Sequence, residues 1–225
     1  MSKKNPTEKE IIDWLDKDKN KLSLLYNKKY INYSGTTAKK YYYDIISKYL
    51  LENINLFNQN NIQEIGRKKP YPQNDKPLTE QERTEIYNKK RGEEWFARGL
   101  LGYDFDDIGK IKYYQLPIKD EKKQKAGKID IIAMNEKSIL SIIELKREYN
   151  SDTLLRAILE INSYFFQVDK KKLRKHFSCS EIQQVVLIFK DSPQHKQYKQ
   201  SKLIKELAQK LKVKILVLDY RVTLP

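Results

Sequence analysis

The spacing of apolar and polar positions divides the chain into segments with different periods. From residue 79 onward, runs typical of β-strands alternate with runs at helical spacing. The predicted strands are residues 111–116, 128–134, 138–146, 184–189 and 213–219. The predicted helices are residues 79–101, 152–168 and 196–212. Helix, three strands, helix, strand, helix and strand follow in that order, which predicts an α/β domain with a mixed sheet covered by helices on two faces.

Short sequence signals mark the ends of these elements. Thr79 and Glu82 predict a capping box at the start of the first helix. Pro117 ends the first strand. Residues 135–137 suit a hairpin between the second and third strands.

The first 65 residues show helical spacing. Two amphipathic helices are predicted there, with apolar residues at Ile11, Ile12, Trp14 and Leu15 and at Tyr42, Ile45, Ile46, Tyr49 and Leu50. Thr36 or Thr37 could cap the second helix. Residues 66–78 carry three prolines and no apolar period, which is typical of a linker. We therefore expect a helical extension at 1–65, a linker at 66–78 and the α/β domain at 79–225.

The chain is strongly basic. Among its 225 residues, 45 Lys and Arg outnumber 30 Asp and Glu, which gives a net charge of +15. This excess indicates a polyanionic partner such as nucleic acid. A lysine-rich composition can also arise from an AT-rich genome without selection for binding, so charge alone leaves the partner open.

Composition also excludes several classes of protein. No run of 18 apolar residues is present, so a membrane-spanning helix is not expected. Cys179 is the sole cysteine, which excludes an internal disulfide and a zinc site built from several cysteines. The first ten residues lack the apolar stretch of a secretory signal, and we therefore expect a cytoplasmic protein.

One segment, residues 127–148, places charged residues inside apolar strands. Asp130 lies in the second predicted strand, and Glu144 and Lys146 end the third. Side chains alternate along a strand, so Glu144 and Lys146 point to one face of the sheet and Leu145 to the other. If the two strands pair as a hairpin, Asp130 lies beside Glu144.

Buried charges of this kind need partners. Two adjacent carboxylates repel each other unless a cation lies between them, and carboxylate oxygens suit Mg²⁺ or Mn²⁺. A metal ion there can polarise a phosphodiester and lower the pKa of a bound water. Lys146 could orient that water, help to deprotonate it or stabilise charge that develops on the phosphate. A plain cross-strand ion pair between Asp130 and Lys146 is the simpler alternative.

The segment resembles the PD-(D/E)xK nuclease superfamily, whose members have a restriction-endonuclease-like fold with a mixed central sheet flanked by helices. The residues that carry the resemblance are Gly127, Asp130, Glu144, Lys146 and the flanking isoleucines. The core order of that family, α-β-β-β-α-β, agrees with residues 79–190, about half of the chain. Ile129 stands where members often have a proline.

The resemblance implies a deoxyribonuclease that depends on Mg²⁺ or Mn²⁺. Asp130 and Glu144 would be metal ligands, the carbonyl of Leu145 would complete the metal shell, and Lys146 would be the catalytic lysine.

Many members of the family add a glutamate from the first helix. Glu93 is the favoured candidate, because it shares a helix face with apolar residues that are expected to face the sheet. Those residues are Ile86, Phe96, Ala97 and Leu100. Glu94 lies about 100° further round the helix and is the alternative.

Four further residues could bind substrate. They are Gln115, Lys128, Arg156 and Tyr164. Many DNA-processing members carry a Gln and a Tyr, four apart, on the helix after the motif; Tyr164 matches the Tyr, whereas Glu160 stands in place of the Gln. This departure counts against the exonuclease-type subgroup. A surface ion pair between Arg156 and Glu160 is the alternative.

We therefore expect a metal-dependent nuclease that hydrolyses phosphodiester bonds in DNA, with RNA less favoured by family precedent. The alternative is a non-catalytic nucleic-acid-binding or interaction subunit of a DNA-processing or defence complex on the same fold. A homo-oligomer or a partner subunit is compatible with either. Basic runs at 119–125 and 171–176 flank the motif and could contact a nucleic-acid backbone or be solvated loops.

Overall fold

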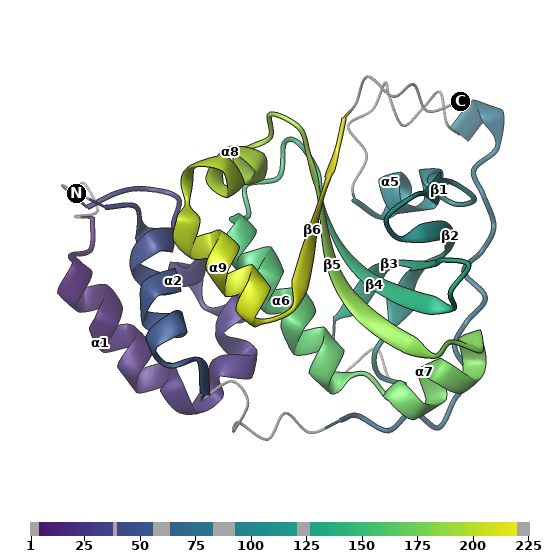
Figure 1. The fold of residues 1–225 in the computed structure, drawn as a ribbon, viewed down its shortest axis with the longest axis horizontal. Coiled ribbons are helices and arrows are strands. Elements are labelled where there is room, and N and C mark those ends of the chain that lie inside the picture. Colours follow the sequence, from purple (N-terminus) through teal and green to yellow (C-terminus); the bar gives the residue numbers. More distant parts are fainter. Residues whose placement is uncertain (1–4, 38–39, 56–63, 83–92, 121–126, 220–225) are drawn as a thin grey trace.

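The computed structural model describes residues 5–37, 40–55, 64–82, 93–120 and 127–219 (Figure 1). Its centre is a curled mixed sheet of six strands that lie in sequence order. The strands are β1 Asp104–Phe105, β2 Gly109–Pro117, β3 Lys128–Met134, β4 Ile139–Lys146, β5 Glu181–Phe189 and β6 Val213–Leu218. Strands β1 to β4 pair antiparallel, and β4, β5 and β6 pair parallel.

The connections follow from these pairings. A tight turn joins β3 to β4, in which the Asn135 side chain accepts the Ile139 N–H at 3.0 Å and Ser138 takes a left-handed conformation. Parallel strands need longer crossovers. Helices α6 Leu154–Gln167 and α7 Lys170–Phe177 connect β4 to β5, and α8 Pro193–Gln200 and α9 Lys202–Lys210 connect β5 to β6.

Helices cover both faces of the sheet (Figure 1). Helix α6 packs on β4 and β5 over a large apolar core, and α5 Glu93–Gly99 covers β2, β3 and β4 over a smaller core on the other face. On β4, Ile142 belongs to the first core, whereas Ile143 and Leu145 belong to the second. This alternation is expected of a strand that is buried on both faces.

The N-terminal segments pack outside α6 and α9 (Figure 1). They are α1 Glu8–Asp18, two 3₁₀ segments, η1 Lys19–Asn27 and η2 Lys29–Asn32, and α2 Tyr42–Glu52. Thr7 and Glu10 form a capping box at the start of α1, which satisfies backbone N–H groups that a helix start leaves unpaired. The apolar residues of these segments join those of α6 and α9 in one cluster. The proposed division at 1–65, 66–78 and 79–225 stays a prediction.

The predicted strands and the predicted helix at 152–168 are confirmed, and β3 has the predicted bounds. The single helix predicted at 196–212 is wrong: the chain is extended at Ser201, whose hydroxyl accepts the Ile204 N–H and starts a second helix. The predicted cap of α2 by Thr36 or Thr37 is also wrong, because Tyr41 precedes the helix and no side chain caps it.

Residues 171–176 are helical rather than a solvated loop. They lie in α7, which Asp169 caps by accepting the Lys172 N–H at 2.8 Å. Only Leu173 and Phe177 of this helix are buried, so its apolar period is weak in the sequence. The other basic run, 119–125, lies outside the described residues from 121 onward.

The predicted helix at 79–101 is described at its two ends. Thr79 and Glu82 form the predicted capping box, with the Glu82 N–H donating to Thr79 Oγ1 at 3.3 Å. Residues 83–92, which include Ile86, lie outside the described residues. The predicted linker at 66–78 contains neither helix nor strand, although Arg67, Tyr71 and Leu78 within it are buried.

Gly109 provides a test of how closely β2 approaches the β3–β4 turn. Its φ is +78°, and a Cβ there would overlap the backbone of Asn135. Gly109→Ala should lower the free energy of unfolding by at least about 2 kcal/mol, because backbone atoms cannot move aside. In thermal denaturation this corresponds to a fall in Tm of about 4–8 °C. Gly66→Ala is the control, because no atom lies within 4 Å of its added Cβ. Equal stability of the two variants would contradict the close approach.

Candidate functional site

The candidate site lies at one end of the sheet, where β3 and β4 separate. Their regular pairing ends one residue short of Asp130 and Glu144, and both of these side chains are buried. Glu144 and Lys146 lie on the α6 face of the sheet, and Leu145 belongs to the core under α5. The structure therefore brings Asp130, Glu144 and Lys146 to one place, as strand alternation predicts.

Two donors hold Asp130. The Gln115 side chain donates to one carboxylate oxygen at 2.9 Å, and the Leu145 N–H donates to the other at 3.0 Å. Gln115 is missing from the β2–β3 register, its φ is 50°, and its carbonyl accepts from the Asn74 side chain at 3.2 Å. A non-glycine residue in this conformation costs about 1 kcal/mol, and such strain concentrates at functional sites. The backbone distortion aims Gln115 at Asp130.

Lys146 is a buried ammonium among three carboxylates. Its Nζ donates to Glu144 Oε1 at 2.6 Å and lies 3.5 Å from Asp152 Oδ2 and 3.7 Å from Glu160 Oε2. Only 4% of the Lys146 side chain is exposed, so these carboxylates replace water as its partners. The simple Asp130–Lys146 pair considered from the sequence is not formed; the nearest partner is Glu144.

Helix α6 contributes Glu160 and Tyr164 to the cluster. Glu160 accepts a hydrogen bond from the Tyr164 hydroxyl at 2.8 Å, which orients the carboxylate next to Lys146. Tyr164 packs against Gly127, where a Cβ would overlap the tyrosine hydroxyl. The glycine that precedes β3 thus leaves the space that Tyr164 occupies.

Glu93, at the start of the described part of α5, reaches the same region. Its carboxylate accepts a hydrogen bond from the Asn150 side chain, and Glu93 is half-buried whereas Glu94 is exposed. Phe96 and Ala97 on the same helix are buried against the sheet. The geometry therefore favours Glu93 over Glu94 as the glutamate of the first helix.

Burial and crowding of like charges shift the pKa values of the cluster. Burial raises the pKa of Asp130 to about 7, and the charges of Glu93 and Glu160 add to this shift. Burial also raises the pKa of Glu144, and the neighbouring Asp130 raises it further. For Lys146, burial alone would lower the pKa, but Glu144, Glu160 and Glu93 outweigh burial and raise it. Lys146 is therefore protonated at neutral pH.

The donor set fits a divalent cation in its chemistry. The carboxylates of the cluster are Glu93, Asp130, Glu144, Asp152 and Glu160, and their cationic partners are Lys146 and Arg156. A divalent cation would relieve the excess of negative charge that, after burial, raises the pKa values of Asp130 and Glu144. No three His, Cys, Asp or Glu side chains of the described residues are grouped as a ready metal site. Glu144 would have to exchange its bond to Lys146 for a bond to the cation.

Of the four predicted substrate-binding residues, some contact the cluster and one does not. Gln115 and Tyr164 contact the cluster. Arg156 donates to Asp152 Oδ1 at 2.7 Å, so the ion pair with Glu160 that the sequence offered as an alternative is wrong. Lys128 is exposed at the start of β3, opposite Pro117, and no contact with the cluster is seen.

Sequence reasoning missed Asp152 and Asn150. Asn150 donates to Glu93 through its Nδ2 and accepts the Asp152 N–H at 2.6 Å through its Oδ1. Asp152 precedes Thr153, whose hydroxyl caps α6, so Asp152 looks like an ordinary polar residue at a helix start. The sequence did contain one signal for Asp152: it is an acidic residue six positions after Lys146, at the first position of the predicted helix.

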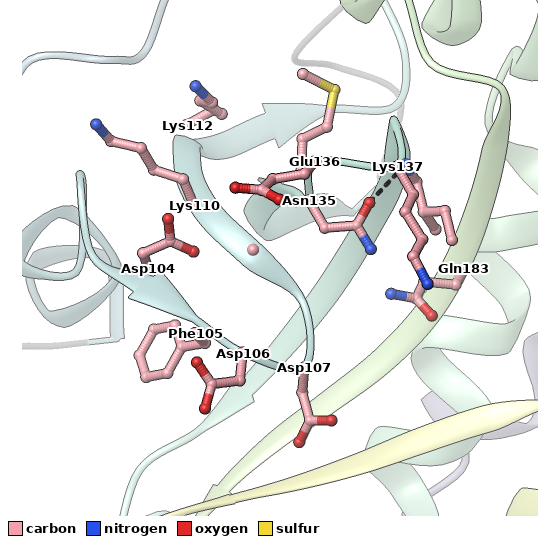
Figure 2. Close-up of a pocket in the computed structure, with 13 residues that line it drawn as sticks. Asp104, Phe105, Asp106, Asp107, Lys110, Lys112, Asn135, Glu136, Lys137 and Gln183 are labelled. Carbon is pink, nitrogen blue, oxygen red and sulfur yellow. Dashed lines mark hydrogen bonds between the residues drawn. The ribbon is translucent and has the colours of Figure 1, made fainter.

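A groove of about 830 Å³ lies at the opposite end of the sheet. Figure 2 shows the residues that line it. It is lined by β1 and the turn after it, by the first parts of β2, β4 and β5, and by the end of β3 with the turn that follows. None of the predicted site residues lines it. Its charges are mixed, and Asp107 pairs with Lys214 at 2.9 Å. The groove is therefore separate from the residues that were predicted to bind metal and substrate.

No protein-family model matches the chain, and no curated protein or solved structure matches it either. Within the described ranges, no helix is both long and apolar enough to cross a membrane.

The raised pKa of Asp130 predicts how stability depends on pH. In the folded protein this pKa is about 7, above the ordinary value of 3.8, so the folded state binds a proton that the unfolded state has lost. Stability should therefore fall as pH rises through this window. At pH 8, Asp130→Asn should be more stable than the wild type by about 1–2 kcal/mol, or about 2–8 °C in Tm.

Thermal denaturation in EDTA at pH 4.5 and pH 8 measures this difference, which should nearly vanish at the lower pH. Asp106→Asn is the control, because Asp106 is exposed. If Asp130→Asn instead lowered stability at pH 8, burial of the charged Asp130 carboxylate would not be destabilising, and the prediction would be wrong.

Proposed function

We propose that this protein is a divalent-metal-dependent nuclease of the PD-(D/E)xK type, with a restriction-endonuclease-like fold, that hydrolyses phosphodiester bonds in DNA. The observation that carries the proposal is the buried convergence of Asp130, Glu144 and Lys146 where β3 and β4 separate. The element order α5, β2, β3, β4, α6, β5, to which the short β1 and helix α7 are added, agrees with the core of that family.

The charge of the cluster supports a role for a cation. Carboxylates in this number repel a phosphodiester unless positive charge lies between them. Asp130 and Glu144 would hold the cation, with Glu93 on the α5 side and the Leu145 carbonyl completing the shell. When bound, Mg²⁺ or Mn²⁺ would polarise the phosphodiester and lower the pKa of a water molecule.

Lys146 contributes positive charge that does not depend on pH near neutrality. Its raised pKa favours the roles in which it stays protonated, namely orienting the attacking water and stabilising negative charge that develops on the phosphate. The raised pKa disfavours Lys146 as the base. Gln115 keeps Asp130 in place through its hydrogen bond at 2.9 Å.

A basic surface supports nucleic acid as the substrate. Lys172 of α7 donates to the carbonyl oxygens of Arg67 and Lys68 at 2.8 and 2.9 Å. These bonds hold α7 against the segment around residues 67–69. Exposed basic side chains gather on these two segments, at Lys68, Lys69, Lys171, Arg174 and Lys175. Such groups bind phosphates without reading sequence. The family resemblance favours DNA over RNA.

The Lys146–Glu144 ion pair favours a second candidate function. If this pair persists when metal is present, the buried charges are structural only. The chain would then be a non-catalytic nucleic-acid-binding or interaction subunit of a larger complex.

Cleavage by the purified protein tests the proposal. Circular and linear duplex DNA, single-stranded DNA and RNA are incubated with Mg²⁺, Mn²⁺ or EDTA. We expect DNA cleavage with metal only, and a loss of at least about 100-fold in Lys146→Ala and Asp130→Ala, because each removes charge on which the transition state depends. Lys137→Ala, an exposed lysine in the β3–β4 turn, is the control and should cleave as the wild type does.

The outcomes separate the two candidates. Metal-dependent cleavage that is absent from both site variants, with their folding checked by circular dichroism, would support the nuclease. DNA binding without cleavage and without metal binding would support the non-catalytic subunit. Cleavage of equal rate in Lys146→Ala would sink the assigned role of Lys146.

Glu93 and Glu94 provide a matched pair of substitutions. The charge of Glu93 acts on both Asp130 and Lys146. Glu93→Gln should therefore lower kcat/KM with Mg²⁺ by about tenfold or more, whereas Glu94→Gln, at an exposed position, should stay within about twofold. Steady-state cleavage at several Mg²⁺ concentrations measures both. Equal values for the two variants would remove Glu93 from the site.

A further inference from the structure

Asp152 connects the buried lysine to the N-terminal part of the chain. One of its carboxylate oxygens lies 3.5 Å from Lys146 Nζ. The other accepts hydrogen bonds from Arg156 at 2.7 Å and from the Asn32 side chain at 2.9 Å. Asn32 ends η2, so a residue 120 positions before Asp152 in the chain helps to fix the orientation of this carboxylate.

Asn32 makes two bonds that can be separated by substitution. Its Nδ2 donates to Asp152, and its Oδ1 accepts the Thr153 N–H at 2.6 Å. The Thr153 hydroxyl returns a bond to the Ile31 carbonyl at 3.0 Å. The bonds that involve Thr153 hold the start of α6, whereas the bond to Asp152 acts on a charged side chain beside Lys146.

The need for Asp152 follows from the proposed function. Glu144 is both the nearest partner of Lys146, at 2.6 Å, and a proposed metal ligand. When Glu144 turns toward a cation, the buried ammonium needs other partners, because an unpaired buried charge costs several kcal/mol. After Glu144, the carboxylates nearest to the Lys146 ammonium are those of Asp152 and Glu160.

We propose that Asp152 is a positioning residue that holds Lys146 when Glu144 binds metal, and that Asn32 of the N-terminal segment holds Asp152 for this task. The inference rests on the proposed metal-dependent function. It makes the N-terminal segment a part of the reactive site, in addition to any contact that it makes with substrate.

Asn32→Asp is the decisive variant. An aspartate keeps an acceptor for the Thr153 N–H, and a negative charge at the start of α6 is favourable to the helix. It replaces the donor to Asp152 with a second carboxylate, which repels it. A purely structural role for Asn32 therefore predicts no defect, whereas the positioning role predicts one. Tyr30→Phe, which removes the bond from Tyr30 to Asp18 in the same segment, is the matched control.

The measurement is calorimetric titration of the full chain with Mn²⁺ in the absence of DNA. We expect Asn32→Asp to weaken Mn²⁺ binding about fivefold, because Glu144 then stays with Lys146. Plain electrostatics predicts the opposite sign, since the variant adds a negative charge. In a Lys146→Ala background the effect of Asn32→Asp should disappear, because it acts through Lys146. Tyr30→Phe should leave binding unchanged in both backgrounds.

Three results would overturn the inference. Unchanged Mn²⁺ affinity in Asn32→Asp, with wild-type binding intact, would refute it while leaving the proposed function standing. An equal loss in the Lys146→Ala background would show that Asn32 acts on the whole fold. Absence of Mn²⁺ binding by the wild type would remove the proposed function and this inference together.

Asp152→Asn provides a second route if Asn32→Asp does not fold. It retains the shape of the side chain and removes the charge that faces Lys146. We expect weaker Mn²⁺ binding that again depends on the presence of Lys146, and a fall in kcat with KM within about twofold. A loss that persists in the Lys146→Ala background would contradict the positioning role.

Discussion

The buried ammonium of Lys146 is the interaction on which the site depends. It lies within 3.7 Å of carboxylates from β4, from the segment just before α6 and from the middle of α6. Without it, the neighbouring carboxylates would repel each other in a largely buried region. Even with it, burial raises the pKa of Asp130 to about 7, and the charges of Glu93 and Glu160 add to the shift. The cluster is therefore held together and yet short of positive charge, which is the condition that suits a cation-binding site.

The surrounding fold supports this arrangement at a cost in stability. Gln115 adopts a left-handed backbone to reach Asp130, and Asp130 and Glu144 are buried with raised pKa values. Strain and buried charge of this kind persist only where well-packed surroundings impose them. Two apolar cores, one on each face of β4, supply that packing. The N-terminal segment adds to it on the α6 side, through Asn32 and its contacts with Asp152 and Thr153.

Local patterns predicted most of the architecture, because strand alternation and helical spacing are properties of neighbouring residues. The pattern of 128–134 predicted β3 to the residue, and alternation placed Glu144 and Lys146 on one face. Two kinds of information were out of reach. Helix α7 buries only Leu173 and Phe177, too few apolar positions to show a period among lysines. The contact between Asn32 and Asp152 joins residues far apart in the chain, and no local pattern encodes which polar side chains meet across such a distance.

A crystal structure with Mn²⁺ would show whether Glu144 leaves Lys146 to bind a cation. We expect an anomalous peak between Asp130 and Glu144, with Glu144 turned away from Lys146. The Lys146 ammonium should then lie closer to Asp152 and Glu160 than the present 3.5 and 3.7 Å. Absence of a peak at this position in millimolar Mn²⁺, with the Lys146–Glu144 pair still at 2.6 Å, would contradict a metal site here and leave the buried charges as structural elements of the fold.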